Sequence, residues 1–193
     1  MKPDRRKTLC DAGIEVLARQ GARGLTHHNV DDEAGVSRGS TSYYYRTRLS
    51  LTQAVMERIA ELDMQDVQNL HSTQSDTLRA IAKLIHNWLS GPGLIRTRAR
   101  HELFLIASRE PAIAEIVGET RKAMSDSISN LVTEFAATKI SEKVAYDVAK
   151  TGIWLVDGLM LSTVRENTAP PSLRIIQKAL ETNLRANLEM ATN

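Results

Sequence analysis

The segment 34–48 constrains the fold of this chain more than any other stretch of the sequence. It begins Ala-Gly-Val-Ser, in which Gly35 can take the left-handed conformation that ends one helix, Val36 can fill the space between two helices, and Ser37 can cap the next. Short polar residues, three tyrosines and then arginines follow, with no carboxylate between Val36 and Arg48. A helix of this composition buries little and offers many hydrogen-bond donors to a phosphate backbone. The segment therefore predicts the turn and second helix of a helix-turn-helix.

Length and charge favour a small basic N-terminal part on a larger body. The chain has 193 residues and a net charge of +2, enough length to bury a sizeable core. Residues 1–60 carry ten lysines and arginines against seven aspartates and glutamates, with Arg38, Arg46 and Arg48 at the centre of the excess. The single cysteine, Cys10, excludes an intrachain disulfide framework. With neither a signal-peptide pattern nor an apolar run of membrane-spanning length, we expect a cytoplasmic protein that makes no membrane contact.

Apolar residues recur at helical spacing almost throughout, and alternating, strand-like segments are absent. The pattern therefore predicts an all-α fold. Thr26 and Ser50 are the expected caps of the second and fourth helices, and residues 90–93 and 170–171 are expected breaks. Arg96, Arg98 and Arg100 alternate, so we expect a solvated surface there. The predicted helices cover about 5–20, 27–35, 38–44, 50–70, 76–89, 94–108, 111–137, 141–166 and 173–188, with a loop at 69–76.

The first 60 residues resemble one known family. A helix, Gly-Ala-Arg-Gly-Leu-Thr, a second helix, Ala-Gly-Val-Ser, Arg-Gly-Ser, a tyrosine cluster, a basic residue and Leu follow one another here as they do in the TetR family of bacterial transcriptional repressors. The resemblance implies an all-α homodimer with a three-helix DNA-binding head, a fourth helix leading into a ligand-binding body, and last two helices that pair across a two-fold axis. We accordingly expect a helix-turn-helix domain at 1–48 and an effector-binding and dimerisation domain at 49–193. One departure is Val30-Asp31, where family members usually have Ile-Ala; the charge must point outward or find a partner.

Candidate DNA contacts gather around the predicted recognition helix. Arg38 suits guanine by a bidentate pair, and the short hydroxyl side chains after it suit bases or thymine methyls. The tyrosines and the arginines at 46 and 48 suit phosphates, whereas Tyr45 is expected to pack inward. The start of the second helix favours a phosphate, although two adjacent histidines cannot face the same way. The full expected set is Thr26, His27, His28, Ser37, Arg38, Ser40, Thr41, Ser42, Tyr43, Tyr44, Arg46 and Arg48.

The body holds candidates for two further sites. Large or polar residues on otherwise apolar helices suit a pocket for an apolar or aromatic compound, although each also suits a packed core; they are His86, Trp88, His101, Phe104, Met124, Trp154, Asp157 and Met160. The last two helices have more apolar surface than one small body is expected to cover. Their expected dimer contacts are Leu155, Leu159, Leu180, Leu184 and Leu188.

These patterns predict a dimeric repressor that binds a palindromic double-stranded DNA operator and is released by a small apolar effector. An activator or a DNA-binding protein without a ligand remains open, and an α-helical enzyme or protein-interaction module is the more distant alternative. No arrangement of nucleophile, phosphate loop or metal-ligand spacing is present, and His27-His28 has no further ligand at suitable spacing. We therefore expect no catalytic site, metal or cofactor.

Overall fold

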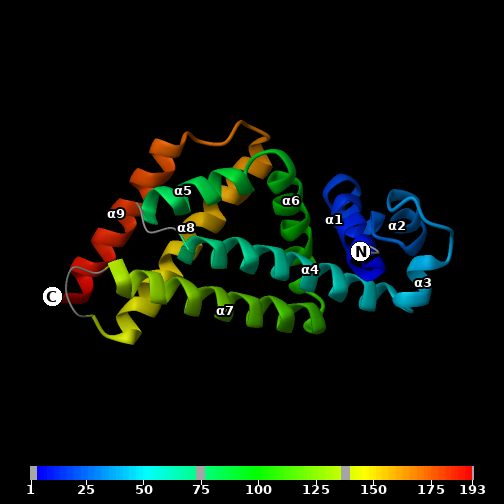
Figure 1. The fold of residues 1–193 in the computed structure, drawn as a ribbon, viewed down its shortest axis with the longest axis horizontal. Coiled ribbons are helices and arrows are strands. Elements are labelled where there is room, and N and C mark those ends of the chain that lie inside the picture. The colour runs from blue at the N-terminus through cyan, green and yellow to red at the C-terminus, as the bar shows by residue number, and fades with distance from the viewer. Residues whose placement is uncertain (1–3, 73–76, 136–139, 193) are drawn as a thin grey trace. The chain divides into compact units, whose positions relative to one another are not determined.

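The computed structural model describes residues 4–72, 77–135 and 140–192, and over these residues the chain is helical and contains no strand (Figure 1). The expected all-α class is confirmed. In chain order the elements are α1 (Arg5–Gly24), α2 (His27–Glu33), α3 (Ser40–Tyr44), α4 (Arg48–Gln68), the short 3₁₀ helix η1 (Asn69–Ser72), α5 (Thr77–Trp88), α6 (Gly91–Ala107), α7 (Pro111–Phe135), α8 (Glu142–Glu166) and α9 (Leu173–Thr192).

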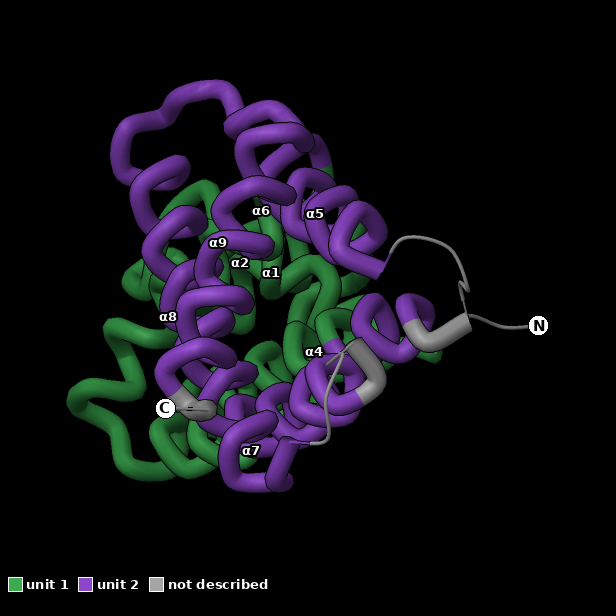
Figure 2. Tube along the Cα trace, turned by 90° about the vertical axis from the view of Figure 1, so that its left-hand side faces the viewer, with its two compact units in different colours: residues 1–63, 92–120 green, residues 64–91, 121–193 purple. Residues whose placement is uncertain are grey.

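The chain forms two compact units (Figure 2). Unit 1 consists of Met1–Asp63 and Pro92–Thr120, and unit 2 consists of Met64–Gly91 and Arg121–Asn193. The proposed head, 1–48, lies within unit 1 together with most of α4 and α6. The helices α4, α6 and α7 each contribute residues to both units.

Several helix ends follow from local sequence as expected. Gly21, with φ 66° and ψ −173°, interrupts α1 where the first helix was predicted to stop. Thr26 is the N-cap of α2, and its hydroxyl accepts a hydrogen bond from the Asn29 amide at 3.2 Å. Ser141 caps α8 in the same way, with the Val144 amide 3.3 Å from its hydroxyl.

Two predicted boundaries are wrong. The Thr47 amide donates to Ser50 Oγ at 3.1 Å and the Ser50 amide donates to Thr47 Oγ1 at 3.0 Å, so Thr47 caps α4 and Ser50 lies in its first turn. The helix predicted to begin at about 94 begins at Gly91, because proline at 92 is tolerated in a first turn, where its missing amide would have no partner in the helix. The loop predicted at 69–76 contains η1, and residues 73–76 lie outside the described part.

The core of unit 1 packs α1, α2, α4 and α6 together. Its fully buried apolar side chains include Leu9, Leu17, Val30, Leu51, Val55, Ile59 and Leu103. The helices α1 and α4 approach so closely at Gly13 that an added Cβ would lie 2.6 Å from Val55 Cγ2. Glycine at this position therefore permits the packing, which outweighs its helix-propensity cost of about 1 kcal/mol.

A buried ion pair lies in the same unit. Arg100 donates from Nε and Nη2 to Asp63 at 3.0 and 2.7 Å, and Arg96 Nε lies 3.1 Å from Asp63 Oδ1. The expectation that all three arginines of this stretch form a solvated surface is wrong, since Asp63 and Arg100 are only 5% and 7% exposed.

Unit 2 has two smaller apolar clusters. In the first, α5 contacts α8 and α9 through Ile85, Trp88, Met160 and Ile176. In the second, α7 and α8 contribute Val132, Ala145, Val148 and Ala149, against which residues of α9 pack. The helix α9 therefore belongs to both clusters and is held along its length.

Candidate nucleic-acid interface

The helices α2 and α3 form a helix-turn-helix. Gly35 has a φ of 62° at the end of α2, and Val36 packs against the core of unit 1, as the sequence predicts. The Val36 amide donates to the Asp31 carbonyl at 3.0 Å and holds the turn against α2. The helix α3 follows as a five-residue segment whose outer face carries polar side chains.

The cap of α3 differs from the prediction. Ser37 does not cap it; the N-cap residue is Gly39, with φ 90° and no side-chain hydrogen bond of its own. The side chain of Asp31, from α2, performs this function. Its carboxylate accepts hydrogen bonds from the Gly39 amide at 2.8 Å, the Thr41 amide at 2.7 Å and the Thr41 hydroxyl at 2.6 Å. Asp31 therefore has the partner that a buried charge requires.

Five of the expected DNA-contacting side chains are exposed on and beside α3. They are Ser37, Arg38, Ser42, Tyr43 and Arg46. Tyr43 is 76% exposed, which is unusual for an aromatic ring in a small domain. An exposed ring and hydroxyl, with Arg38 before it and Arg46 after it in the sequence, suit the surface of a DNA duplex.

Arg38 is oriented by its neighbours on α2. Its Nη2 donates to His28 Nε2 at 3.0 Å, and the same ring nitrogen lies 3.4 Å from Asp32 Oδ2. All three side chains are exposed. Arg38 is thus placed beside α3 and remains accessible to a base edge.

The other two tyrosines hold α3 onto α1. The Tyr44 ring is half-buried, lies edge-on to Tyr43 with centroids 5.1 Å apart, and faces the Arg6 guanidinium at 5.7 Å. Tyr45 packs inward, with its hydroxyl 3.2 Å from Cys10 Sγ. Burial raises the pKa of Tyr45, and its contact with Cys10 raises it further.

Four expected contacts are engaged within the head. Thr41 is fully buried against Asp31, so its side chain is not available to DNA. Ser40 Oγ donates to the Ser37 carbonyl at 2.6 Å. His27 Nε2 is hydrogen-bonded to the Tyr45 carbonyl at 2.6 Å. Arg48 donates to the Ala22 carbonyl. Thr26 keeps an exposed position while its hydroxyl caps α2.

Ala22 is also bound from the other side. Its amide donates to Glu102 Oε2 on α6 at 3.0 Å, so the residue after the kink at Gly21 contacts both α4, through Arg48, and α6. Sequence reasoning missed Glu102, because neither its position on α6 nor its neighbours mark it as a partner of α1.

Comparison with known proteins identifies the body of the chain. Residues 72–189 match the family model described as "Tetracyclin repressor-like, C-terminal domain". The chain belongs to the TetR family. TetR-family proteins are transcriptional regulators and not enzymes. Comparison with the curated proteins gave no match.

Several solved structures share the fold of this protein over nearly the whole chain. A TetR-family member from Streptomyces coelicolor A3 is 24% identical with a TM-score of 0.73, covering 94% of this chain and 98% of that one. A transcriptional regulator from Rhodococcus sp. Rha1 is 20% identical with a TM-score of 0.79, covering 96% and 97%. The multidrug binding protein EbrR, solved with ethidium, is 24% identical with a TM-score of 0.68, covering 95% and 99%.

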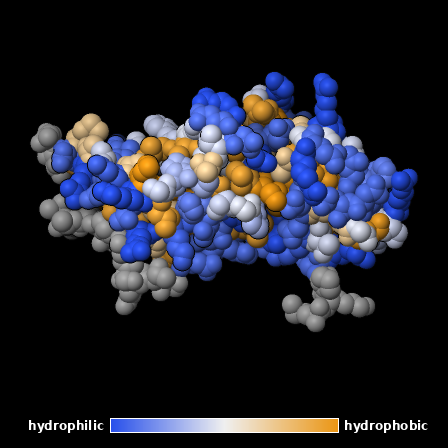
Figure 3. All heavy atoms as spheres, turned by 90° about the horizontal axis from the view of Figure 1, so that it is seen from above, coloured by the Kyte–Doolittle hydropathy of each residue, from blue (hydrophilic) through white to orange (hydrophobic). Residues whose placement is uncertain are grey.

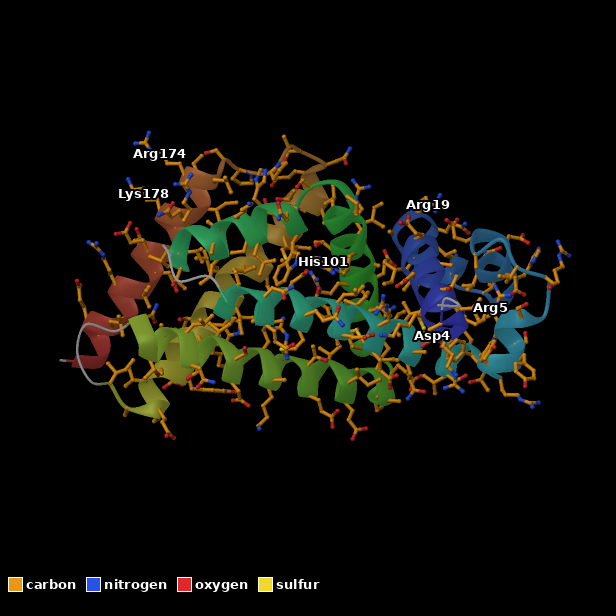
Figure 4. All side chains as sticks on the ribbon, viewed as in Figure 1. Asp4, Arg5, Arg19, His101, Arg174 and Lys178 are labelled. Carbon is orange, nitrogen blue, oxygen red and sulfur yellow. The ribbon has the colours of Figure 1, made fainter. Side chains whose placement is uncertain are left out.

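The residues expected to line an effector pocket in this TetR-family chain are divided between the two units. His101 and Phe104, whose rings lie 6.1 Å apart, belong to unit 1, and the other six belong to unit 2 (Figure 4 shows His101 on α6). Within unit 2, Trp88 and Met160 are buried in one cluster, Met124 packs against it, and His86 Nδ1 is bonded to the Pro171 carbonyl at 3.2 Å.

The remaining two have different surroundings. Trp154 is 57% exposed and has Lys150 over its ring at 5.4 Å, so it does not line a buried pocket. Asp157 is half-buried and forms an ion pair with Arg121 of α7, so its charge is paired within the chain. Only the group around Trp88 retains the character of the predicted site.

The expected dimer residues are used inside unit 2. Leu159 and Leu180 pack against the first apolar cluster, Leu184 and Leu188 against the second, and Leu155 is half-buried. The apolar side chains that α8 and α9 leave exposed are others: Trp154, Leu161, Leu173, Ile175 and Met190. On one face of the molecule, hydrophobic patches are visible between hydrophilic side chains (Figure 3).

Within the described residues, no three histidine, cysteine, aspartate or glutamate side chains are grouped so that they could hold a metal ion. A search of the same residues for a helix both long and apolar enough to cross a membrane finds none.

Proposed function

We propose that this TetR-family chain is a repressor that binds a palindromic DNA operator as a homodimer and releases it when a small effector binds. The observation that carries the proposal is the exposed surface of α3 and of the turn before it. Ser42 and Tyr43 on α3, and Arg38 in the turn, are exposed to solvent on a helix-turn-helix that packs against the core of unit 1. A recognition helix of this kind enters the major groove, and two of them in a dimer meet half-sites about 34 Å apart.

Base reading and phosphate binding are divided among the exposed residues. Arg38 suits the O6 and N7 acceptors of guanine, and Ser42 is short enough to approach a base edge or thymine methyl. Tyr43, with its exposed hydroxyl, and Arg46, at the end of α3, suit phosphates. Arg48 is bound to Ala22, so we assign it to the structure of the head and leave it out of the phosphate contacts.

Replacing Arg38 by alanine is expected to weaken operator binding by about 1–3 kcal/mol and relax base preference at one symmetric pair of positions. The measurement is a gel shift at several salt concentrations with a duplex that the wild-type protein selects from a random pool. Arg185→Ala is the matched control, since Arg185 is an exposed arginine on α9 paired with Glu181. A wild-type protein that selects no duplex contradicts the proposed function, and an Arg38→Ala variant with unchanged affinity removes Arg38 from base reading.

The proposed dimer face consists of one stripe on α8 and one on α9, two helices that pack against each other. On α8, exposed Trp154, Gly158 and Leu161 follow at spacings of four and three residues and therefore share a side. On α9 the corresponding exposed stripe is Ile175, Ala179, Thr182, Ala186 and Met190. Arg174 and Lys178, which project outward from α9 in Figure 4, border this stripe. Small residues between large apolar ones suit close packing of a second copy.

The effector site is proposed beside Trp88 in unit 2. Trp88 Nε1 donates to Asp66 Oδ2 at 2.8 Å, and Met124 and Met160 belong to the same apolar cluster. A half-buried carboxylate next to an indole favours an aromatic organic cation, through charge and through the ring face. EbrR, with the same fold, has been solved with ethidium and with proflavin, and a protein from Saccharomonospora viridis with choline.

Ethidium is therefore expected to quench Trp88 emission, measured in Trp154→Phe, which leaves Trp88 as the only tryptophan. Asp66→Asn should weaken ethidium binding about tenfold, because a desolvated cation loses its countercharge. Phenanthridine, the neutral parent ring system of ethidium, should bind both forms equally. By linkage, ethidium should lower operator affinity by the factor by which the operator lowers ethidium affinity. Unchanged Trp88 emission at saturating ethidium would place the site elsewhere.

A further inference from the structure

Asp31 is the least exposed charged side chain of the head. It is 1% exposed and lies in the middle of α2. Within the part of the chain that the structure describes, its carboxylate is hydrogen-bonded only to two backbone amides and a hydroxyl. A buried carboxylate usually faces an arginine or lysine. Here it faces the first turn of α3, so its role differs from that of the ion pair at Asp63.

The helix α3 depends on this contact for its N-terminal end. A helix of five residues is far below the length that is stable alone, and its first amides have no partner within the helix. A cap normally comes from the residue just before the helix, but Gly39 has no side chain and occupies the left-handed region at φ 90°. The amides of Gly39 and Thr41 therefore depend on Asp31.

A cap supplied by another helix also fixes the position of the capped helix, which a local cap does not. A serine at the N-cap position would stabilise α3 in any orientation, because it moves with the helix. Asp31 is eight residues before Gly39 and ten before Thr41, on a helix that is itself packed in the core through Val30. Its three hydrogen bonds, at 2.6–2.8 Å, consequently fix where α3 starts relative to α2.

The carboxylate is ionised when it does so. Burial alone would raise the pKa of Asp31, but the hydrogen bonds from Thr41 and Gly39 outweigh burial and hold the pKa below its ordinary value. The nearby charge of His27 acts in the same direction. An ionised carboxylate accepts shorter and stronger hydrogen bonds than a neutral amide oxygen would.

We propose that Asp31 is a positioning residue that orients the recognition helix and thereby determines operator selectivity, without contacting DNA. This inference rests on the proposed function. Base edges are read by directional hydrogen bonds, so a small rotation of α3 misaligns Arg38 and Ser42 with the groove. Phosphate attraction is less directional and depends on the number of cations. Loss of the cap should thus reduce specific binding far more than non-specific binding.

The test compares Asp31→Asn with the wild-type protein on two duplexes. The first is the duplex selected by the wild-type protein from a random pool, and the second is a scrambled duplex of the same length. Asparagine keeps the size of the side chain but offers one acceptor oxygen to three donors. We expect affinity for the selected duplex to fall about tenfold, as for the loss of a strong helix cap, and affinity for the scrambled duplex to stay within about twofold. The salt dependence should be unchanged.

Two sets of control variants separate positioning from general damage. Glu33→Gln removes another carboxylate of α2, which is exposed and paired with Arg19 on α1, and should leave the selectivity ratio unchanged. Thr41→Ser keeps both donors to Asp31, whereas Thr41→Val removes the hydroxyl and should lower the ratio. Because Thr41→Val acts through the same carboxylate, adding it to Asp31→Asn should cost less than the product of the two single effects.

Amide hydrogen exchange gives a readout that needs no DNA. The Thr41 amide should exchange faster in Asp31→Asn, while the amides of α1 and α4 keep their protection. If Asp31→Asn is unfolded at the assay temperature by circular dichroism, Thr41→Val carries the same test. Equal losses on both duplexes, or a selectivity ratio unchanged by both variants, overturn the inference. A wild-type protein that selects no duplex fails the proposed function first and is distinguished by that result.

Discussion

Gly158→Glu is expected to convert the proposed dimer into a monomer and to lower operator affinity at least about a hundredfold, since a monomer engages one half-site alone. Gly158 lies between Trp154 and Leu161 on the proposed dimer face, and a Cβ added there meets, among the described residues, nothing within 4 Å outside its own stretch of helix. The substitution therefore leaves the protomer intact but places a long charged side chain in the closest part of the contact. Analytical ultracentrifugation and the gel shift together measure both effects.

Gly118→Glu is the matched control. Gly118 is an exposed helical glycine on α7, and a Cβ there also meets nothing within 4 Å. Both substitutions exchange glycine for a better helix former, so neither should destabilise the protomer. A Gly158→Glu protein that sediments as a dimer would remove α8 from the interface. Aspartates at Leu180 and Leu184 do not offer this test, because those side chains pack inside unit 2.

The second large effect is expected from Asp63→Ala, which should lower the free energy of unfolding by about 3–5 kcal/mol. The substitution removes the carboxylate that Arg100 binds at 2.7–3.0 Å and that Arg96 faces at 3.1 Å, and it leaves both guanidinium groups in a low-dielectric site. Urea unfolding at neutral pH measures the change.

The surface pair of Lys143 and Asp147 provides the comparison. Their side chains are 2.7 Å apart and strongly exposed, so Asp147→Ala should lower the free energy of unfolding far less than Asp63→Ala does. A loss below about 1 kcal/mol for Asp63→Ala would show that the two arginines find other partners or water when the carboxylate is removed.

The sequence predicted those features of the head that depend on neighbouring residues. Gly35 ends α2, Thr26 caps it and Val36 enters the core because each of these roles needs only a few adjacent positions. The cap of α3 was mispredicted as Ser37 for the same reason. Local rules compare residues within one turn, whereas the carboxylate that caps α3 comes from the preceding helix.

The body is harder to predict, because an apolar stripe on a helix does not indicate whether it packs against the same chain or against a partner. Leu180, Leu184 and Leu188 form a stripe on α9, but the stripe is covered by helices of the same unit. The alternation of Arg96, Arg98 and Arg100 predicts an exposed surface. However, Arg96 and Arg100 are four residues apart and share a helix face, and both pair with Asp63. A partner 30 residues away or more left no local signal.

Ala22 shows how much a chain can depend on a residue whose side chain does nothing. Its amide is bound by Glu102 and its carbonyl by Arg48, so the identity of the side chain is irrelevant to both bonds. Nearly every amino acid offers the same two groups, and only proline lacks the amide. The amino acid at position 22 therefore gives almost no indication of these bonds, although α4 and α6 both contact the backbone there. Apart from proline at position 22, only substitutions of Glu102 and Arg48 would therefore reveal how much the chain depends on these two bonds.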